Sequence, residues 1–202
     1  MKILIGSNNK KKIAEISAIF QNAFGDKVEF CLPNEVFENA PDPEETGATL
    51  DENAVIKAKC FHELSGLPCV ADDTGLEIDA LGGAPGVISA RFAGEHGDDQ
   101  ANRTKVLELM SETSESQRNA HFRSVFCFAD GDTMFTVDGI IEGKIIDHER
   151  GSGGFGYDSI FVPNGYTETF AELSAEVKNS ISHRSRAIAA LVAKLKEMDI
   201  VK

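Results

Sequence analysis

Apolar and polar positions along the chain fall into short runs of strand length and longer stripes with helical spacing. The stripes predict helices over residues 10–24, 50–64, 99–110 and 183–198. The runs and alternating segments predict strands over 2–5, 28–32, 67–71, 76–81, 119–129, 133–140, 144–147 and 159–163. Asp130-Gly131 separates two of the alternating segments, which predicts a β-hairpin there.

Two of the predicted helices follow residues that favour N-caps. Thr49 precedes the second helix, with Glu52 in capping-box position three residues later, and Ser182 precedes the last helix. The acidic, proline-bearing segment 33–47 is predicted to be a loop.

Two adjacent aspartates, Asp72 and Asp73, end the strand predicted at 67–71. Open α/β sheets bind ligands at the carboxyl ends of their strands, and successive strand side chains point to opposite faces, so we expect only one of the pair to face a given site. Asp73 is suited to a divalent cation, because hard cations take carboxylate oxygens. A simple turn at Thr74-Gly75, with aspartates bonded to nearby backbone, is the alternative.

The first helix begins with three cations. A polar turn, residues 6–9, leads into Lys10, Lys11 and Lys12. Cations are unfavourable at the positive end of a helix dipole, and an anion resting on the helix N-terminus and the lysines would remove that conflict. A solvated basic turn is the alternative. The segment lacks the glycines and the Lys-Ser/Thr ending of a Walker loop.

Further polar groups flank the second helix. Glu44 and Glu45 precede it and are candidates for a second metal carboxylate, although composition alone favours a solvated acidic run. Asn53 and Lys57 are four residues apart, so they share one helix face beside the apolar stripe.

A second glycine-rich stretch, residues 151–158, sets Phe155 and Tyr157 among four glycines. A ring in such a loop can stack on a nucleic base while neighbouring amides reach the base edge; a ring packed in the core is the alternative. The last predicted helix, like the first, has cations at the positive end of its dipole, because His183, Arg184 and Arg186 lie at its start. Two such helices in one chain indicate a bound polyanion.

The charge of the chain narrows the class of ligand. The formal net charge of −13 and the sequence pI of about 4.8 argue against a general nucleic-acid binder, which needs a basic surface. A polyanionic ligand must therefore meet local positive charge.

The sequence also bears on location. No apolar run approaches the ~20 residues of a membrane span, and the start MKILIGSNNKKK has no signal-peptide pattern. We therefore expect a cytoplasmic protein without a membrane partner, with Cys31, Cys60, Cys69 and Cys127 as reduced thiols.

Seven segments of the chain together resemble the inosine triphosphate pyrophosphatase family, which removes non-standard purine nucleoside triphosphates. These segments stand in family order and at family spacing, and they are SNNKKK, EETG, ENAVIKA, ADDTGLEIDALGGAPGVISARFAG, GGFGYD, AEL and KNSISHRSRA. The resemblance implies one α/β domain over residues 1–202, elongated and two-lobed, with a long curved mixed β-sheet flanked by helices and a substrate cleft between the lobes. It also implies a homodimer that hydrolyses ITP, dITP and XTP to the monophosphate and pyrophosphate with Mg²⁺.

The resemblance assigns roles by motif. The triphosphate would be held by Lys57 and by Ser7, Asn8, Asn9, Lys10, Lys11 and Lys12. Glu45 and Asp73 would hold the metal, and Asp73 would also be the acid/base residue for the attacking water. The remaining substrate contacts would come from Thr74, Phe155, Gly156, Tyr157, Asp158, Lys178, His183 and Arg184.

The chain departs from the family pattern at two positions. Thr74 replaces the usual serine and keeps the hydroxyl, and Ser159 replaces the proline that usually follows GFGYD. Two alternative functions compete with this assignment. The first is a related pyrophosphatase that acts on modified pyrimidine triphosphates or 7-methylguanosine triphosphate. The second is a nucleotide-binding module without enzymatic turnover. The blocks SHR and GGFGYD argue against the first rival, and retention of Glu45 and Asp73 argues against the second.

Overall fold

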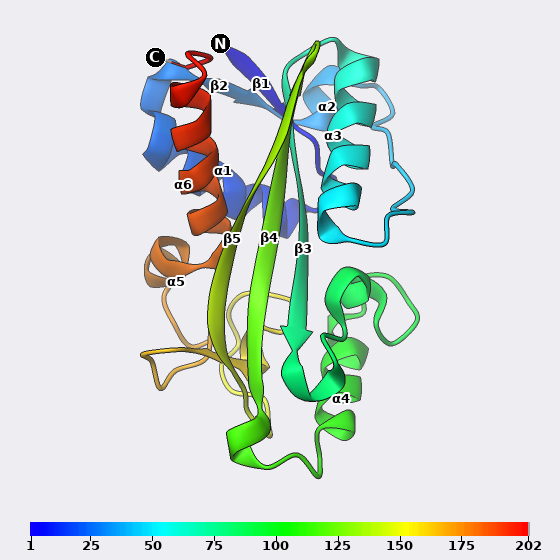
Figure 1. The fold of residues 1–202 in the computed structure, drawn as a ribbon, viewed down its shortest axis with the longest axis vertical. Coiled ribbons are helices and arrows are strands. Elements are labelled where there is room, and N and C mark those ends of the chain that lie inside the picture. The colour runs from blue at the N-terminus through cyan, green and yellow to red at the C-terminus, as the bar shows by residue number, and fades with distance from the viewer. Residues whose placement is uncertain (202) are drawn as a thin grey trace. The chain divides into compact units, whose positions relative to one another are not determined.

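The computed structural model describes residues 1–201, with only the backbone at position 26, and contains a six-stranded mixed sheet flanked by helices (Figure 1). The strand order is β2-β1-β3-β4-β5-β6. The strands are β1 (Lys2–Ile5), β2 (Glu29–Cys31), β3 (Cys69–Ile78), β4 (Asn119–Asp130), β5 (Thr133–Ile145) and β6 (Phe161–Pro163). The helices are α1 (Lys10–Phe24), α2 (Pro33–Val36), α3 (Leu50–Ser65), α4 (Asp99–Leu109), α5 (Ala175–Ile181) and α6 (His183–Glu197).

The sheet mixes strand directions. β1 lies parallel to both of its neighbours, with Leu4 opposite Cys31 of β2 and Cys69 of β3. β6 pairs antiparallel with β5. The mixed sheet and its flanking helices confirm the predicted α/β class.

The chain divides into two compact units, each made of separate segments. Unit 1 comprises Met1–Asp73, Ser124–Gly139 and Arg184–Lys202, and unit 2 comprises Thr74–Arg123 and Ile140–His183. Strands β3, β4 and β5 supply residues to both units. The expectation of a single domain over residues 1–202 stays a prediction.

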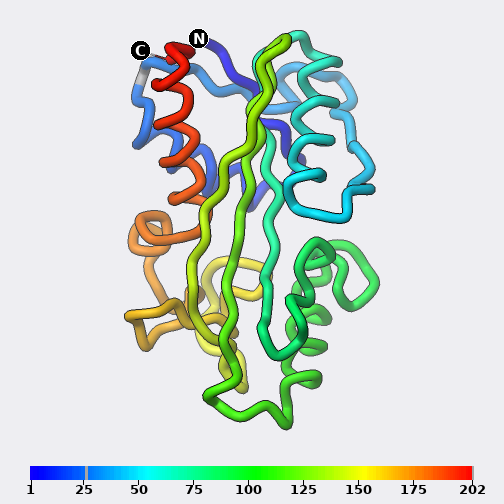
Figure 2. The backbone as a smooth tube through the Cα atoms, in the orientation of Figure 1, coloured from blue at the N-terminus to red at the C-terminus, as the bar shows by residue number. Residues whose placement is uncertain are grey.

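In unit 1 the helices pack on two faces of the strands. Helices α1 and α6 bury Phe20 and Leu191 against Ile3 and Ile5, whereas α3 buries Phe61 against Leu4, which points to the other face. In Figure 1, α6 and α3 accordingly lie on opposite sides of the strands. The N-terminus and α6 from Arg184 onward belong to this same unit, and Figure 2 traces the backbone of both.

In unit 2 the core is rich in aromatic rings. Phe122 of β4 packs edge-on against Phe161 of β6 and stacks with Phe170. Val106 of α4 is fully buried in the same cluster. Buried aromatic side chains remove large apolar areas from water, so this cluster gives a small unit a substantial core.

The predicted N-cap of the second helix is confirmed, because Thr49 Oγ1 accepts the Glu52 N–H at 3.1 Å. The Glu52 carboxylate returns to the Ala48 N–H, one residue earlier than a capping box requires. Helix α4 is capped by Asp98, whose Oδ1 accepts the Ala101 N–H at 2.9 Å. Ser182 is the C-cap residue of α5 and lies directly before α6, so its role as an N-cap of α6 stays a prediction.

The prediction that Asp72 and Asp73 lie at the end of a strand over 67–71 is wrong, and so is the alternative of a turn at Thr74-Gly75. β3 runs without interruption from Cys69 to Ile78, so Asp72 and Asp73 lie inside the strand. Gly75 serves close packing instead: a Cβ there would stand 2.6 Å from the Gly86 carbonyl oxygen. The neighbouring strand β1 stops at Ile5, opposite Val70.

Other element predictions need correction. The predicted strand 133–140 and the start of the predicted strand 144–147 belong to one continuous strand, β5, which ends at Ile145. The segment 33–47, predicted to be a loop, contains the short helix α2. Pro33 is its first residue, and the Glu35 carboxylate accepts the Leu32 N–H immediately before it. The sequence analysis missed α5, which Ser174 caps. Met198 lies beyond α6 and is 41% exposed, so it is not part of the buried stripe.

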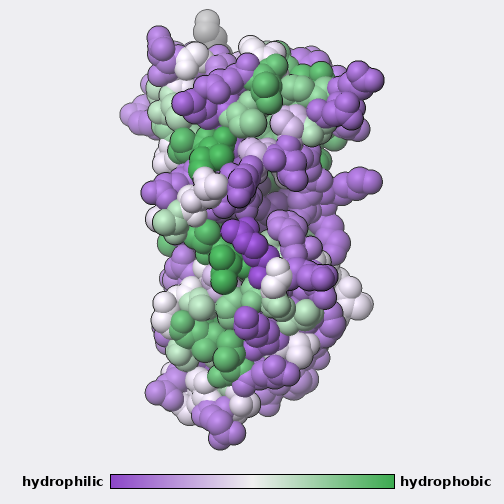
Figure 3. Space-filling view, turned by 90° about the vertical axis from the view of Figure 1, so that its right-hand side faces the viewer, coloured by the Kyte–Doolittle hydropathy of each residue, from purple (hydrophilic) through white to green (hydrophobic). Residues whose placement is uncertain are grey.

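The surface of unit 1 around α3 is mainly polar. Hydrophilic residues predominate there, with hydrophobic residues in small groups (Figure 3). Within the described residues, no helix is both long and apolar enough to span a membrane.

Candidate active site

The loop between β1 and α1 is held by its own polar side chains. Asn9 caps α1, with its Oδ1 accepting the N–H groups of Lys11 and Lys12 at 3.0 and 3.1 Å. The Ser7 hydroxyl accepts the Asn9 N–H, and the Asn8 amide donates to the Pro41 carbonyl oxygen at 2.9 Å. The loop therefore has a fixed shape beyond the end of β1.

Lys12 is the lysine of the first turn that faces inward. Its Nζ lies 3.2 Å from Asp72 Oδ2, while Lys10 and Lys11 are exposed. Asp72 also lies 3.8 Å from Arg184 Nε, and Arg184 Nη1 binds Glu15 at 2.6 Å. Carboxylates of the chain thus offset the cations that start α1 and α6, which explains how the fold tolerates them.

Asp73 faces α3, on the opposite side of β3 from Asp72. Its carboxylate lies 2.8 Å from Lys57 Nζ and 3.3 Å from the Asn53 amide. Lys57 Nζ also contacts Glu45 at 2.7 Å. The predicted pairing of Asn53 and Lys57 on one helix face is confirmed, and so is the prediction that the two aspartates point apart.

Burial and charge together set the protonation behaviour of this cluster. Burial raises the pKa of the Asp73 carboxyl above its ordinary value, although Lys57 and Lys12 oppose the change. Burial alone would lower the pKa of Lys57, but attraction to Asp73, Asp72 and Glu45 outweighs it and raises that pKa. Burial lowers the pKa of Lys12. The cluster therefore keeps Lys57 charged beside a carboxylate that is more basic than a surface aspartate.

The donor set of the cluster fits a magnesium ion. Glu45 and Asp73 already converge on one positive charge, the Lys57 ammonium group. No group of three or more potential metal-ligating side chains occurs among the described residues. Mg²⁺ commonly binds through one or two carboxylates together with substrate phosphates and water, so two carboxylates are enough. Glu44, the other candidate, is exposed.

In unit 2, Asp158 organises the second glycine-rich stretch. Its Oδ2 accepts the Phe155 N–H at 2.8 Å and binds Lys178 Nζ at 2.6 Å. A Cβ on Gly154 would lie within van der Waals overlap of this carboxylate, so only glycine fits there. Lys178 Nζ in turn lies 5.1 Å from the centre of the Phe155 ring, a cation–π distance.

The two aromatic residues of this stretch differ in burial. Phe155 is half-buried, whereas Tyr157 is 4% exposed, packs in the unit 2 core and donates its hydroxyl to the Ser89 carbonyl oxygen at 2.8 Å. The Phe155 ring is thus the one with an accessible surface, and Tyr157 can offer a ligand only its backbone.

The remaining predicted site residues fall in different units. His183, in unit 2, is buried and stacks on Phe122 with ring centres 4.9 Å apart. Arg184, in unit 1, contacts Glu15 and Asp72. Thr74 follows Asp73 in β3 and is half-buried.

The sequence analysis missed a group of polar residues around the second glycine-rich stretch. Asp99 and Arg103 of α4 bind the backbone of Gly156, and Glu149 binds Arg103. The only available indication was the spacing of Asp99 and Arg103, which are four apart and therefore share a helix face.

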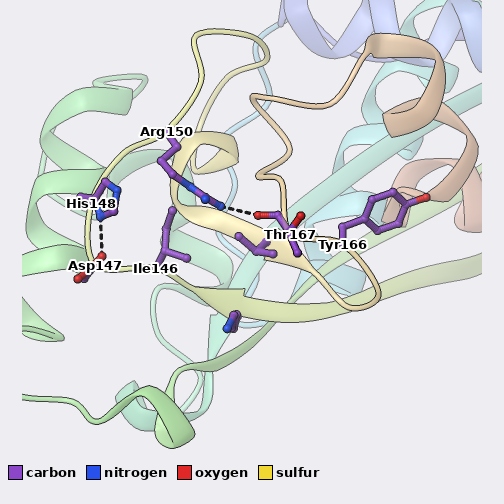
Figure 4. Close-up of a pocket in the computed structure, with 8 residues that line it drawn as sticks. Ile146, Asp147, His148, Arg150, Tyr166 and Thr167 are labelled. Carbon is purple, nitrogen blue, oxygen red and sulfur yellow. Dashed lines mark hydrogen bonds and ion pairs between the residues drawn. The ribbon is translucent and has the colours of Figure 1, made fainter.

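Unit 2 also contains a cavity of about 240 Å³ that includes none of the predicted site residues. Lys144, Ile146, Asp147, His148, Arg150, Val162, Tyr166 and Thr167 line it (Figure 4). His148 pairs with Asp147 at 2.6 Å, and Arg150 donates to the Thr167 carbonyl oxygen at 2.7 Å. The polar groups of the cavity are therefore largely engaged with one another.

The fold is that of an α/β protein, and Lys57, Glu45 and Asp73 form a lysine–carboxylate cluster in unit 1. The chain belongs to the Ham1 family, whose model matches residues 3–194. The family membership inferred from the seven motifs is confirmed.

Two similar proteins, both named dITP/XTP pyrophosphatase, align with nearly the whole chain. It is 43% identical to the dITP/XTP pyrophosphatase of Streptomyces coelicolor over 204 residues, which is 98% of each chain. It is 46% identical to the dITP/XTP pyrophosphatase of Porphyromonas gingivalis over 190 residues, covering 94% of this chain and 95% of the relative.

Solved structures agree with the fold. The Ham1 protein of Staphylococcus aureus is similar with a TM-score of 0.85 at 38% identity, covering 98% of this chain and all of that chain. The dITP/XTP pyrophosphatase of Mycobacterium abscessus is similar with a TM-score of 0.75 at 44% identity, covering 95% of this chain and 98% of that one.

Proposed function

We infer that this protein hydrolyses non-standard purine nucleoside triphosphates, namely ITP, dITP and XTP, to the monophosphate and pyrophosphate. The observation that carries the inference is Lys57, whose ammonium group joins Asp73 and Glu45 in a buried cluster. The relatives named dITP/XTP pyrophosphatase support the choice of substrate. The activity would clear such nucleotides from the nucleotide pool.

The triphosphate binds to the cations and amides at the start of α1. Lys12 and Lys57 provide positive charge close to Asp73, and Ser7 to Lys11 provide the loop and the first helical turn. A helix N-terminus favours anions, and reactions at phosphorus depend mainly on charge neutralisation and positioning. Binding of the substrate also gives Lys12 a second anionic partner besides Asp72.

Glu45 and Asp73 hold the Mg²⁺ ion that the family resemblance implies. When bound, the ion neutralises charge that develops on the phosphate oxygens. The carboxylates of Glu45 and Asp73 and the ammonium group of Lys57 give the cluster a net negative charge, which favours binding of a further cation.

Asp73 accepts the proton of the attacking water. The water oxygen forms a bond to the α-phosphorus, the bond from that phosphorus to the α,β-bridging oxygen breaks, and pyrophosphate leaves. A carboxylate held in place by Lys57 and Asn53 is positioned to act as the general base for this water. Lys57, 2.8 Å away, keeps the carboxylate ionised before the transfer.

The base meets the second glycine-rich stretch. Phe155 offers a ring face, and Gly156 to Asp158 offer backbone groups near Lys178. Thr74, His183 and Arg184 complete the set of substrate residues. Hypoxanthine and xanthine carry an O6 acceptor where adenine carries an amino donor, so a pocket that presents donors to O6 rejects adenine.

Two expectations accompany this function, a homodimer and a location in the cytoplasm. The family resemblance implies the homodimer, whereas the location is expected from the sequence pattern. Sedimentation of the purified protein would test the homodimer.

The proposed substrate preference predicts the outcome of a nucleotide panel. With Mg²⁺ present, kcat/KM for ITP, dITP and XTP is expected to exceed that for ATP by at least about a hundredfold, because pocket donors matched to O6 are left unpaired opposite the adenine amino group. Turnover of GTP is also expected to be lower, but guanine carries O6 as well, so its rejection must come from contacts at the 2-position. Multiple-turnover pyrophosphate release measures it. Equal turnover of ATP would contradict the substrate assignment, and tight binding of ITP without turnover would identify a nucleotide-binding module instead.

A further inference from the structure

Two side chains of helix α4 form hydrogen bonds with the backbone N–H and C=O groups of Gly156, in the second glycine-rich stretch. Asp99 Oδ2 accepts the Gly156 N–H at 3.0 Å, and Arg103 Nη1 donates to the Gly156 carbonyl oxygen at 2.8 Å. Asp99 and Arg103 are four residues apart, so they lie side by side on the helix surface. Hydrogen bonds from charged groups are roughly twice as strong as neutral ones.

Arg103 is itself fixed by neighbours. Its Nε lies 2.9 Å from Glu149 Oε2, and its Nη2 donates to Gln100 at 2.8 Å. Glu149 accepts further hydrogen bonds from Gln100 at 2.8 Å and from the Ser159 hydroxyl at 3.0 Å. Ser159 stands where the family usually has proline, which has no hydroxyl to donate. The guanidinium group is therefore held in one orientation, with its side chain only 15% exposed.

Gly156 is a point at which the loop needs such support. Its φ of +60° lies in the left-handed region, and glycine gains the most conformational freedom when contacts are lost. The residue lies between Phe155, whose N–H is fixed by Asp158, and Tyr157, whose hydroxyl is fixed by Ser89. Without the contacts from α4, the peptide groups next to the Phe155 ring would be free to rotate.

We propose that Asp99 and Arg103 are positioning residues for base selection, holding the Gly156 backbone so that the Phe155 ring and the adjacent amides meet the purine in one geometry. The inference rests on the proposed function of the stretch in base binding. The partners named above for Asp99 and Arg103 all lie in unit 2, whereas Lys57, Glu45 and Asp73 belong to unit 1. Their loss should therefore impair recognition of the base and leave the chemistry at phosphorus intact.

Four variants of the full-length protein test this proposal. Arg103→Ala and Asp99→Ala are expected to raise KM for ITP at least about tenfold, with kcat changed less than about threefold, because each removes a charged hydrogen bond to Gly156. Asp99→Asn keeps an acceptor for the Gly156 N–H and should restore most of the affinity. Lys105→Ala is the matched control: Lys105 is on the same helix, but its Nζ binds the Phe92 carbonyl oxygen at 2.6 Å.

Inhibition by inorganic triphosphate separates positioning of the base from a general structural effect. Because this ligand has no base, its inhibition constant should be unchanged in all four variants. Weaker inhibition by inorganic triphosphate in parallel with the rise in KM would overturn the proposal, as would an unchanged KM for ITP in Asp99→Ala. If Arg103→Ala does not fold, the comparison of Asp99→Ala with Asp99→Asn decides. A parent protein that does not turn over ITP would refute the proposed function and this inference with it; an active parent with unaffected variants refutes this inference alone.

Discussion

Replacing Asp73 with asparagine is expected to lower kcat for ITP at least about a hundredfold, the lower end of what a positioned acid/base group contributes. Asparagine keeps the shape of the side chain and loses its charge and basicity. The variant should remain folded, because Lys57 retains Glu45 at 2.7 Å as a partner. Steady-state kinetics together with a thermal melt measure both parts of the prediction.

Asp72→Asn is the matched control for this variant. Asp72 points to the other face of β3 and contacts Lys12 and Arg184. Its loss should therefore affect kcat less than the loss of Asp73, while the melting temperature falls by several degrees, because removing one partner of a buried ion pair costs about 3–5 kcal/mol. A larger loss of kcat in Asp72→Asn than in Asp73→Asn would show that the wrong aspartate has been assigned to the proton transfer.

Replacing Lys57 with alanine is expected to lower kcat/KM for ITP about a hundredfold, the effect typical of losing one preorganised charge that stabilises a transition state. Lys12→Ala should act in the same direction. The physical reason is lost positive charge on the triphosphate, so binding of inosine, which has no phosphate, should be no weaker in either variant. Enzyme kinetics and calorimetric titration with inosine measure the two effects.

Lys59→Ala controls for the loss of any cation from α3. Lys59 is exposed and pairs with Glu63 at 3.7 Å on the helix surface, so kcat/KM should stay close to that of the parent. If Lys57→Ala and Lys12→Ala lost inosine binding to the same degree as turnover, the two lysines would be structural residues and their role in phosphate binding would be refuted.

The parts of the site that follow local rules were predictable from the sequence. Spacing of four on a helix brought Asn53 and Lys57 together, and strand alternation separated Asp72 from Asp73. The Thr49 cap follows from the preference of hydroxyl side chains for the free N–H groups of a first turn.

The errors arose where distant contacts overrule local preference. Gly75 favours a turn by itself, but in the fold its missing side chain admits the Gly86 carbonyl oxygen, and the strand continues. The ion pair of Arg184 with Glu15 spans 169 residues of the chain, so it could not be predicted from the sequence. The contact of Asp99 with Gly156 spans 57 residues. No periodicity or spacing encodes pairings of that kind.

The central claim, selective cleavage of non-standard purine triphosphates between the α- and β-phosphates, is tested most directly by a competition in one vessel. The protein is incubated with Mg²⁺, a small amount of ITP and a large excess of ATP, and all nucleotides and phosphates are quantified over time. The account predicts that ITP disappears with equal amounts of IMP and pyrophosphate formed, while ATP remains. Consumption of ATP in proportion to its excess, or release of orthophosphate with IDP, would contradict it.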